Sequence, residues 1–289
     1  MEADGRRIIR RGARRGGLTL LAACAALVIA GCQGAGPTPQ TIIITLPPST
    51  PAPTVTPSAV PPTGTPGATA TATPVATTPT VSSTTVTQTA SDNRWDVSFQ
   101  MPVVSGVAPA AVTAMNDAIT TRVNAYIVSF NGSGLPVVAS GDGPSTLAGA
   151  FSVAFASPSL LSLRFTVETY ITGAAHPTTE AGSLNFDVAS GAVIQFPDLF
   201  ASPAVALPVI QARAHTLLTA KLGAALTWPA SPTMADFGGA WAFTPGGLEL
   251  TWSQGVIASE ADGTVTISIA WSALSSVIAK PGPADGFVP

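Results

Sequence analysis

The chain has 289 residues, of which 46% are hydrophobic and only 9% are charged. Half of its twelve basic residues precede the first apolar run: Arg6, Arg7, Arg10, Arg11, Arg14 and Arg15. After Cys32 the chain keeps 6 basic and 13 acidic residues, a net charge of −7 with both histidines neutral. Six scattered cations on an acidic chain argue against the basic stripe that nucleic-acid-binding domains carry.

Residues 1–31 are predicted to be a lipoprotein signal peptide. Behind the arginines, residues 18–30 form an apolar run that is shorter than the roughly 20 residues of a membrane-spanning helix. The run ends in LVIAGC, which resembles the bacterial lipobox, in which the cysteine thiol receives diacylglycerol and the leader is then cut off just before that cysteine. We therefore expect lipid attachment at Cys32 and a location on the extracytoplasmic face of the cell membrane. A plain secretory signal is the alternative, and both the Sec and the twin-arginine export routes stay open.

The segment that follows, residues 32–91, is predicted to be a disordered tether. It has no charged residue and is rich in Pro, Thr, Ala and Ser, so it buries too little apolar area to offset the entropy of ordering. A bias to polyproline II would let it extend over 100 Å or more, at roughly 3 Å per residue. Within it, residues 41–46 (TIIITL) form a short β-prone run.

Residues 92–289 are predicted to form one α+β domain with a mostly antiparallel sheet and two main helices. Residues 94–104 alternate like a strand, and residues 108–130 carry apolar side chains at three- and four-residue spacing, as in a helix that Pro109 starts. Residues 149–157 and 160–172 then predict a hairpin.

The second half of the domain repeats these patterns. SLNFDV and AVIQF, joined by ASG, predict another hairpin, and a short helical turn at PDLF follows. Residues 208–222 predict a helix with Ile210, Ala214, Leu217 and Leu218 inward. The strands AWAFT, LELTWSQ and TVTISIAW and a last helical turn complete the domain.

The sequence contains no familiar catalytic motif: no G-x-S-x-G, H-E-x-x-H, phosphate-binding loop or dinucleotide fingerprint. The two histidines, His176 and His215, fall on different predicted elements, and without a second histidine at i+4 we expect no metal site and no cofactor. His215 reads as an ordinary helix residue. A Ser-His-Asp hydrolase built on His176, or a glycosidase pair of Asp187 and Glu168, lacks the expected local context, so we do not expect an enzyme.

His176 is better explained as a residue that shapes a loop. Gly173 permits a backbone conformation closed to other residues, and Pro177 restricts the chain directly after the histidine. The imidazole can then bond the loop backbone or a neighbouring strand and so fix how one hairpin passes to the next.

The motif YITGAAHPTT, together with LNFDVASGAVIQFPDLF, resembles the extracellular domain family of the anti-sigma factor RsiV. Many members read Y-x-G-G-A-H, then N-F-D, a glycine turn and D-L-F. Ala174 stands here where those members have a second glycine. The resemblance implies an α+β domain of the cell envelope without an established enzyme activity, and it adds Asn185 and Asp187 to Gly173 and His176 as residues that shape the loop or contact a ligand.

The resemblance also implies what kind of partner to expect. RsiV recognises lysozyme, so the expected function is a lipid-anchored, non-catalytic domain that binds an extracytoplasmic partner, either a lysozyme-like protein or peptidoglycan. An envelope hydrolase using His176 and a carrier of small apolar ligands are the alternatives. The sequence leaves the oligomeric state and any glycosylation of the tether open.

Overall fold

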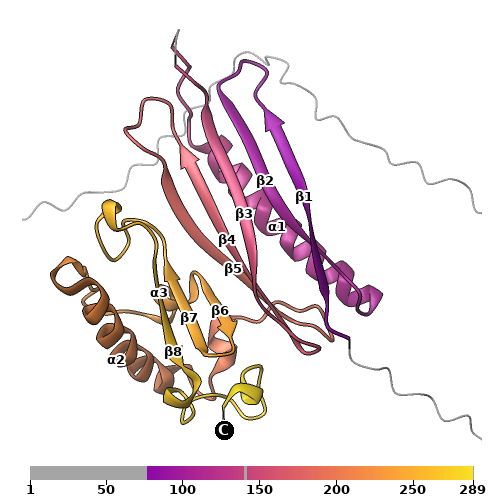
Figure 1. The fold of residues 1–289 in the computed structure, drawn as a ribbon, viewed down its shortest axis with the longest axis vertical. Coiled ribbons are helices and arrows are strands. Elements are labelled where there is room, and N and C mark those ends of the chain that lie inside the picture. Colours follow the sequence, from indigo (N-terminus) through magenta and orange to yellow (C-terminus); the bar gives the residue numbers. More distant parts are fainter. Residues whose placement is uncertain (1–76, 140–141, 289) are drawn as a thin grey trace, which may run out of the picture. The chain divides into compact units, whose positions relative to one another are not determined.

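The computed structural model describes residues 77–139 and 142–288, all within one compact unit that forms an α+β domain with two sheets (Figure 1). The larger sheet has the strand order β1-β2-β3-β4-β5, with β1 (Thr80–Thr89), β2 (Trp95–Ser105), β3 (Ser145–Ala156), β4 (Leu160–Tyr170) and β5 (Thr178–Asp187). Its neighbouring strands are antiparallel except for β2 and β3, which are parallel. The predicted fold class is therefore confirmed.

Helix α1 (Pro109–Gly132) makes the parallel pairing possible, because it carries the chain from the end of β2 back to the start of β3. Pro109 occupies its first turn, where a missing N–H costs nothing. Asn116 fastens the helix to β2: its amide accepts a hydrogen bond from Val104 N–H and donates one to Val104 C=O, both at 2.9 Å.

The first hydrophobic core lies between α1 and one face of the larger sheet. The helix contributes a stripe at three- and four-residue spacing: Ala111, Met115, Ile119, Val123, Tyr126, Ile127 and Phe130. From β4, alternate residues face this stripe and are at most 1% exposed: Leu161, Leu163, Phe165 and Val167. In the sequence of β4 these apolar residues alternate with Ser162, Arg164 and Thr166, as expected for a strand with one face on the core.

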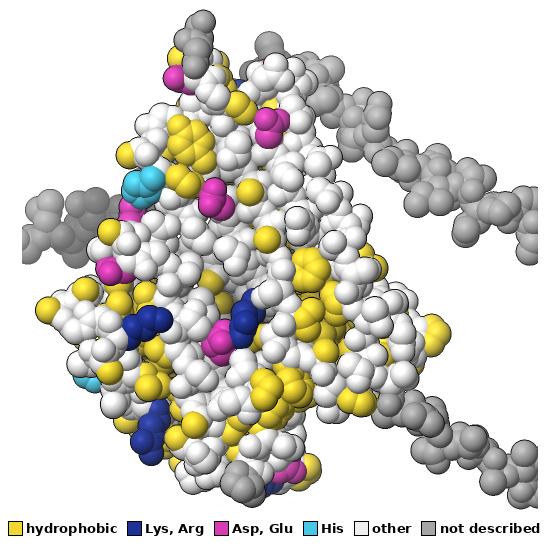
Figure 2. Space-filling model, in the orientation of Figure 1, with side chains coloured by type: hydrophobic (Ala, Val, Ile, Leu, Met, Phe, Trp, Pro, Cys, Tyr) yellow, Lys and Arg dark blue, Asp and Glu magenta, His cyan; other side chains and the backbone are white. Residues whose placement is uncertain are grey.

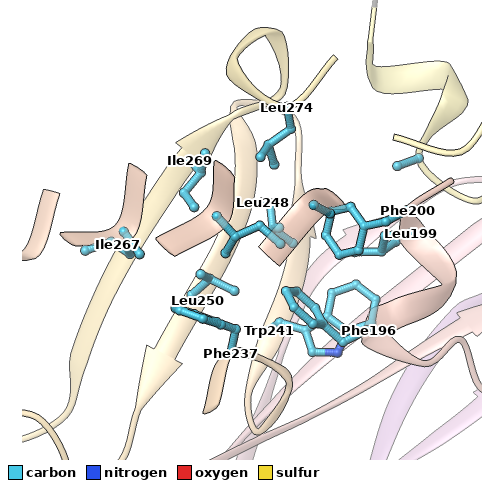
Figure 3. Packing of buried hydrophobic residues seen from close by; sticks show 14 of the residues in the cluster. Phe196, Leu199, Phe200, Phe237, Trp241, Leu248, Leu250, Ile267, Ile269 and Leu274 are labelled. Carbon is cyan, nitrogen blue, oxygen red and sulfur yellow. The ribbon is translucent and has the colours of Figure 1, made fainter. Parts of the chain in front are cut away.

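The second core belongs to the smaller sheet, which has the order β6-β7-β8: β6 (Trp241–Thr244), β7 (Gly247–Trp252) and β8 (Val265–Ala270). Helix α2 (Pro203–Leu222) and the short helix α3 (Met234–Gly238) pack with it. Figure 3 shows how Leu248, Leu250, Ile267 and Ile269 of this sheet meet a cluster of aromatic rings. From α2, side chains four residues apart enter this core with no exposed surface: Ala206, Ile210, Ala214 and Leu218.

A β-bulge lets β3 contribute to both cores. The register between β3 and β4 shifts between Val153 and Phe155, so the side chains after the shift point to the opposite face of the sheet. Phe151 packs against the first core, whereas Phe155 packs against the second, with its ring centroid 5.0 Å from that of Phe287.

Strand β1 corrects the predicted boundary between tether and domain. Residues 80–89, TVSSTTVTQT, were expected to be part of a disordered tether ending at residue 91, but they pair along their whole length with β2. Thr and Val favour strands because their branched side chains suit a pleated surface. Because β1 lies at the edge of the sheet, few buried apolar side chains are enough to hold it there. The domain therefore begins at least twelve residues earlier than expected.

Three smaller expectations also change. Helix α2 begins at Pro203 rather than at residue 208, because Pro203 also suits a first turn and Ala206 extends the buried stripe. Leu217, expected to point inward, is 36% exposed. The residues AVIQF form only an isolated bridge between Val193 and Phe186 instead of a full strand, since a 3₁₀ turn begins at Phe196.

Candidate binding groove between the two sheets

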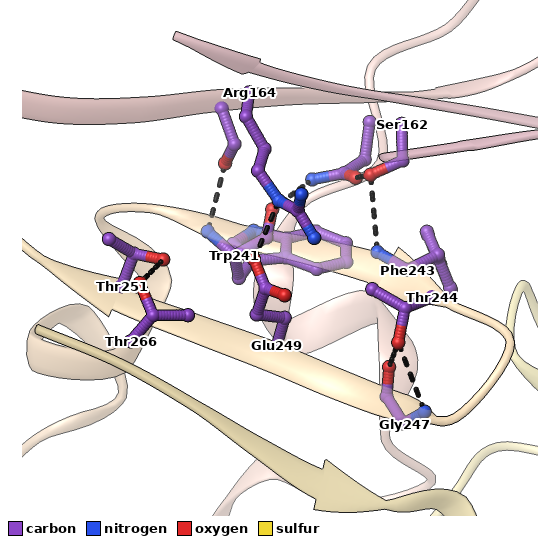
Figure 4. Close-up of polar contacts among 11 residues, drawn as sticks. Ser162, Arg164, Trp241, Phe243, Thr244, Gly247, Glu249, Thr251 and Thr266 are labelled. Atoms are coloured by element: carbon purple, nitrogen blue, oxygen red, sulfur yellow. Dashed lines mark hydrogen bonds and ion pairs between the residues drawn. The ribbon is translucent and has the colours of Figure 1, made fainter. Parts of the chain in front are cut away.

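The outer edge of β6 rests on the face of the larger sheet, and side chains from β4 and β5 bond its backbone. Trp241 N–H donates to Ser183 Oγ at 3.0 Å, and Trp241 C=O accepts from Asn185 Nδ2 at 2.9 Å. Phe243 N–H donates to Ser162 Oγ at 3.1 Å (Figure 4). The face of one sheet thus supplies the partners that an edge strand otherwise lacks.

These three supporting side chains are almost fully buried, and two of them, Ser162 and Asn185, also bond each other. Ser162 and Asn185 are 0% and 1% exposed, and Ser183 is 7% exposed. Ser162 Oγ donates to Asn185 Oδ1 at 2.5 Å, so its hydroxyl group both donates and accepts. Buried polar groups are tolerated when each has a partner, and this network meets that condition.

Beside this network, a groove of about 320 Å³ opens between the two sheets. An ion pair crosses it: Arg164 Nε of β4 lies 2.6 Å from Glu249 Oε1 of β7, and the two side chains are 34% and 18% exposed (Figure 4). The remaining polar lining is made largely of hydroxyl groups, from Thr166, Ser183, Thr251, Thr264 and Thr266. The groove therefore offers one paired cation and anion among neutral donors and acceptors.

The groove lies in a weakly charged surface. Figure 2 shows that charged side chains are sparse on the face it draws, while apolar side chains gather in its lower part. Several carboxylates elsewhere are engaged locally: Asp198, Asp236 and Asp262 each accept the backbone N–H three residues earlier, at the start of a short helix. Within the described residues, no group of three or more His, Cys, Asp or Glu side chains is placed to hold a metal ion.

His176 lies in the loop between β4 and β5, away from the groove lining. Its Nδ1 is 3.0 Å from the carbonyl oxygen of Pro177, and its Nε2 is 3.4 Å from Glu260 Oε2, with both side chains more than half exposed. Gly173, in the same loop, has φ +88°, a conformation that favours glycine. His215 is on α2, where its ring packs edge-on against Trp228 at 5.2 Å.

Asn185 and Asp187 are not near this loop. They lie at the other end of β5, about 23–30 Å from its first residue, Thr178, at a rise of about 3.3 Å per residue. Asn185 holds β6, as described above. Asp187 shapes the turn after β5, because its Oδ1 accepts hydrogen bonds from the N–H (2.8 Å) and the hydroxyl (2.6 Å) of Ser190. The four residues singled out in the sequence therefore do not form one site.

Two groups on the side of β5 that faces away from the groove, Tyr126 of α1 and Glu180 of β5, have shifted pKa values. Burial raises the pKa of the Tyr126 hydroxyl, and partial burial raises the pKa of the Glu180 carboxyl; the nearby Arg122 opposes both shifts. Neither lies in the groove between the sheets. At the start of α3, the hydrogen bonds from Thr233 hold the pKa of Asp236 below its ordinary value.

A second recess, of about 500 Å³, is mainly apolar. It lies next to the C-terminal segment and is lined by Phe155, Leu160, Ile194 and Phe287, with Asp187 at its edge. It is open to solvent rather than enclosed.

Neither a family model nor a curated protein matches this sequence. Among solved structures, the chain is similar to a DUF3298 family protein from Pseudomonas aeruginosa PAO1, with 14% identity, a TM-score of 0.49, and coverage of 69% of this chain and 94% of that chain. A DUF3298 family member from Bacteroides fragilis has 15% identity and a TM-score of 0.43, with 70% and 94% covered. Its structural neighbours are thus DUF3298 proteins.

The predicted signal peptide, Cys32 and most of the predicted tether lie outside the described residues. Within the described ranges, no helix combines the length and the apolar character needed to cross a membrane.

Proposed function

We propose that this chain is a lipid-anchored lipoprotein of the cell envelope whose domain binds an extracytoplasmic partner without catalysing a reaction. The leader and the lipobox-like LVIAGC support attachment at Cys32. The diacylglycerol supplies two acyl chains, enough for stable attachment where one chain is marginal. The long stretch between Cys32 and β1 would hold the domain away from the membrane.

The observation that carries the binding proposal is the groove between the sheets. Its hydroxyl groups and the Arg164–Glu249 pair can bond a neutral polar ligand, such as a glycan of the cell wall, without leaving a charge unpaired. A protein partner is favoured by a different property. The net charge of −7 after Cys32 would attract a basic protein such as a lysozyme-like muramidase.

Two variants of the purified full lipoprotein test the groove. Thr166 is an exposed residue of the groove lining, so Thr166→Trp fills the groove and is expected to reduce binding at least tenfold. Ser98→Trp is the matched control, because Ser98 is exposed on β2 and does not line the groove. Binding is measured against lysozyme and against purified peptidoglycan. Equal binding by both variants, or no binding by the unaltered chain, would contradict the proposal.

The lipid anchor is tested separately by mass spectrometry of the chain extracted from membranes. A mature N-terminus at Cys32 carrying an acyl mass is expected. A chain that keeps residues 1–31 and has no acyl mass on Cys32 would exclude the anchor.

A hydrolase using His176 is the first alternative, and the closeness of Glu260 to its imidazole is the observation that favours it. His176→Ala separates the two functions. Loss of a measured hydrolysis with unchanged unfolding would establish the enzyme. We expect no such loss, and a change in the free energy of unfolding below about 0.5 kcal/mol, because exposed ion pairs contribute little.

A carrier of small apolar ligands is the second alternative, and the open apolar recess beside Phe155 and Phe287 is what favours it. A fluorescent fatty acid is a suitable probe. Saturable binding that Phe287→Ala weakens, and that Thr166→Trp leaves unchanged, would support this alternative over the groove.

A further inference from the structure

Within the described residues, three of the four outer sheet edges are engaged by other parts of the domain. The backbone of β5 bonds to Ser253 and Gln254 near its start, through contacts of 2.8–3.0 Å. Ile194 N–H bonds Asn185 C=O at 2.7 Å near its end. The edge of β6 is held by the buried network described above, and Lys221 Nζ of α2 donates to Thr266 C=O of β8 at 2.8 Å.

Strand β1 is different. It is the first strand of the larger sheet and pairs with β2 over all ten of its residues, with no bulge. Eight of these residues are exposed and only Val81 and Val86 are half-buried. The one side-chain hydrogen bond recorded within the described residues for this strand runs inward, from Ser82 Oγ to Val103 C=O.

The sequence of β1 carries none of the features that keep edge strands apart. TVSSTTVTQT has no charged residue and no proline, whereas natural edge strands are usually protected by Lys, Pro or a bulge. The strand is about 33 Å long, which is long for an exposed edge. Its threonine side chains favour extended backbone and pair well across antiparallel strands.

We propose that β1 pairs with β1 of a second copy of this chain, so that two larger sheets join into one continuous sheet. A twofold axis makes the pairing antiparallel and lets each strand use the same surface. A neutral strand suits this partner, because two identical edges meet without like-charge repulsion. The length of chain before β1 also suits it: residues 33–79 span up to about 150 Å when extended, so two copies anchored in one membrane can align their strands in opposite directions.

Disulfide cross-linking in the membranes of producing cells tests the pairing with the full chain. Single cysteines replace each residue from Ser82 to Thr87, and the chain without an added cysteine gives the background from Cys24 and Cys32. In an antiparallel pair, each step along the strand moves the two copies of a residue apart by about 7 Å, whereas a disulfide needs Cα atoms within roughly 7 Å. Cross-linking should therefore peak at one or two positions and fall off on both sides.

Ser98→Cys is the matched control, since Ser98 pairs with Thr87 but lies one strand farther from the edge. It is expected to give only background dimer. Light scattering of the detergent-purified lipoprotein should show a dimer that Thr85→Lys with Thr87→Lys converts to monomer and that Ser98→Lys preserves. A flat cross-linking profile, an adduct with a different protein in place of the dimer, or a monomer in the unaltered chain would overturn the proposal.

Discussion

The hydroxyl group of Tyr126 occupies the space that a side chain at position 182 would need. A Cβ atom added to Gly182 would lie 2.0 Å from Tyr126 Oη and 3.3 Å from its Cζ. The contact joins α1 to β5, and the tyrosine oxygen is buried, with Arg122 nearby. Tyr126 is thus the reason that position 182 must be glycine. A shorter residue at position 126 would leave room for a methyl group at position 182.

This relationship predicts a coupled pair of substitutions. Gly182→Ala should lower the free energy of unfolding by about 2 kcal/mol or more, since the crowded oxygen must move within a packed core. Tyr126→Phe alone should change the free energy of unfolding by less than about 1 kcal/mol, because the nearby Arg122 is only half-buried and can bond water in place of the lost hydroxyl. In the Tyr126→Phe background, Gly182→Ala should lower the free energy of unfolding by only about 1 kcal/mol or less. Urea unfolding of the four proteins measures the coupling, and strictly additive effects would contradict the proposed contact.

The amide of Asn185 is expected to be among the most sensitive polar groups in the domain. Asn185→Ala removes the acceptor of Ser162 and the donor to Trp241 C=O and leaves both groups buried, so a loss of about 2–4 kcal/mol is expected. Asn124→Ala, on the exposed side of α1, is the matched control and should change stability by less than about 0.5 kcal/mol. Similar losses in the two variants would show that Asn185 does not hold β6.

The Arg164–Glu249 pair should show coupling because it is largely shielded from solvent. Arg164→Gln or Glu249→Gln alone should cost about 1–2 kcal/mol, since each leaves the other charge half-buried. The double variant should recover part of that loss. Thermal unfolding at low and high salt gives the comparison, and a double variant as unstable as the sum of the singles would refute the pairing.

Asp236 predicts a dependence of stability on pH. Its pKa is lower in the folded chain than its ordinary value of 3.8, because Thr233 N–H and Oγ bond its Oδ2 at 2.6 and 2.7 Å. Between the two pKa values the unfolded chain binds more protons, so this stabilisation is present above about pH 4 and is lost as the pH falls through the folded pKa.

Asp236→Ala should therefore cost about 0.5–1 kcal/mol at pH 7, and the difference from the unaltered chain should shrink below pH 4. Unfolding measured from pH 7 to pH 3 gives the trend. Asp117→Ala, which removes an exposed carboxylate outside any helix start, controls for the change in net charge. A difference that stays constant with pH would argue against the carboxylate bonds.

Periodicity predicted most of the elements because a buried face repeats every two or about 3.6 residues. The stripes of α1 and β4 are examples, and both can be read from their own segments. Strand β1 was not predicted, because an edge strand buries few side chains and its threonine-rich sequence resembles that of a linker. The supporting role of Asn185 escaped because its partner Trp241 lies 56 residues away, and Ser162 lies 81 residues from Phe243. No local pattern in the sequence indicates how the smaller sheet will pack against the larger one.

The seating of β6 on the larger sheet has a consequence for how the domain opens. Moving the smaller sheet away from the larger one would break the hydrogen bonds of the Trp241 and Phe243 backbone and leave the side chains of Ser162, Ser183 and Asn185 without these partners. Phe155 would leave the aromatic cluster in the same motion. The two cores should therefore unfold as a single cooperative unit, and the most protected amide protons of both halves should report the same free energy of opening in hydrogen exchange.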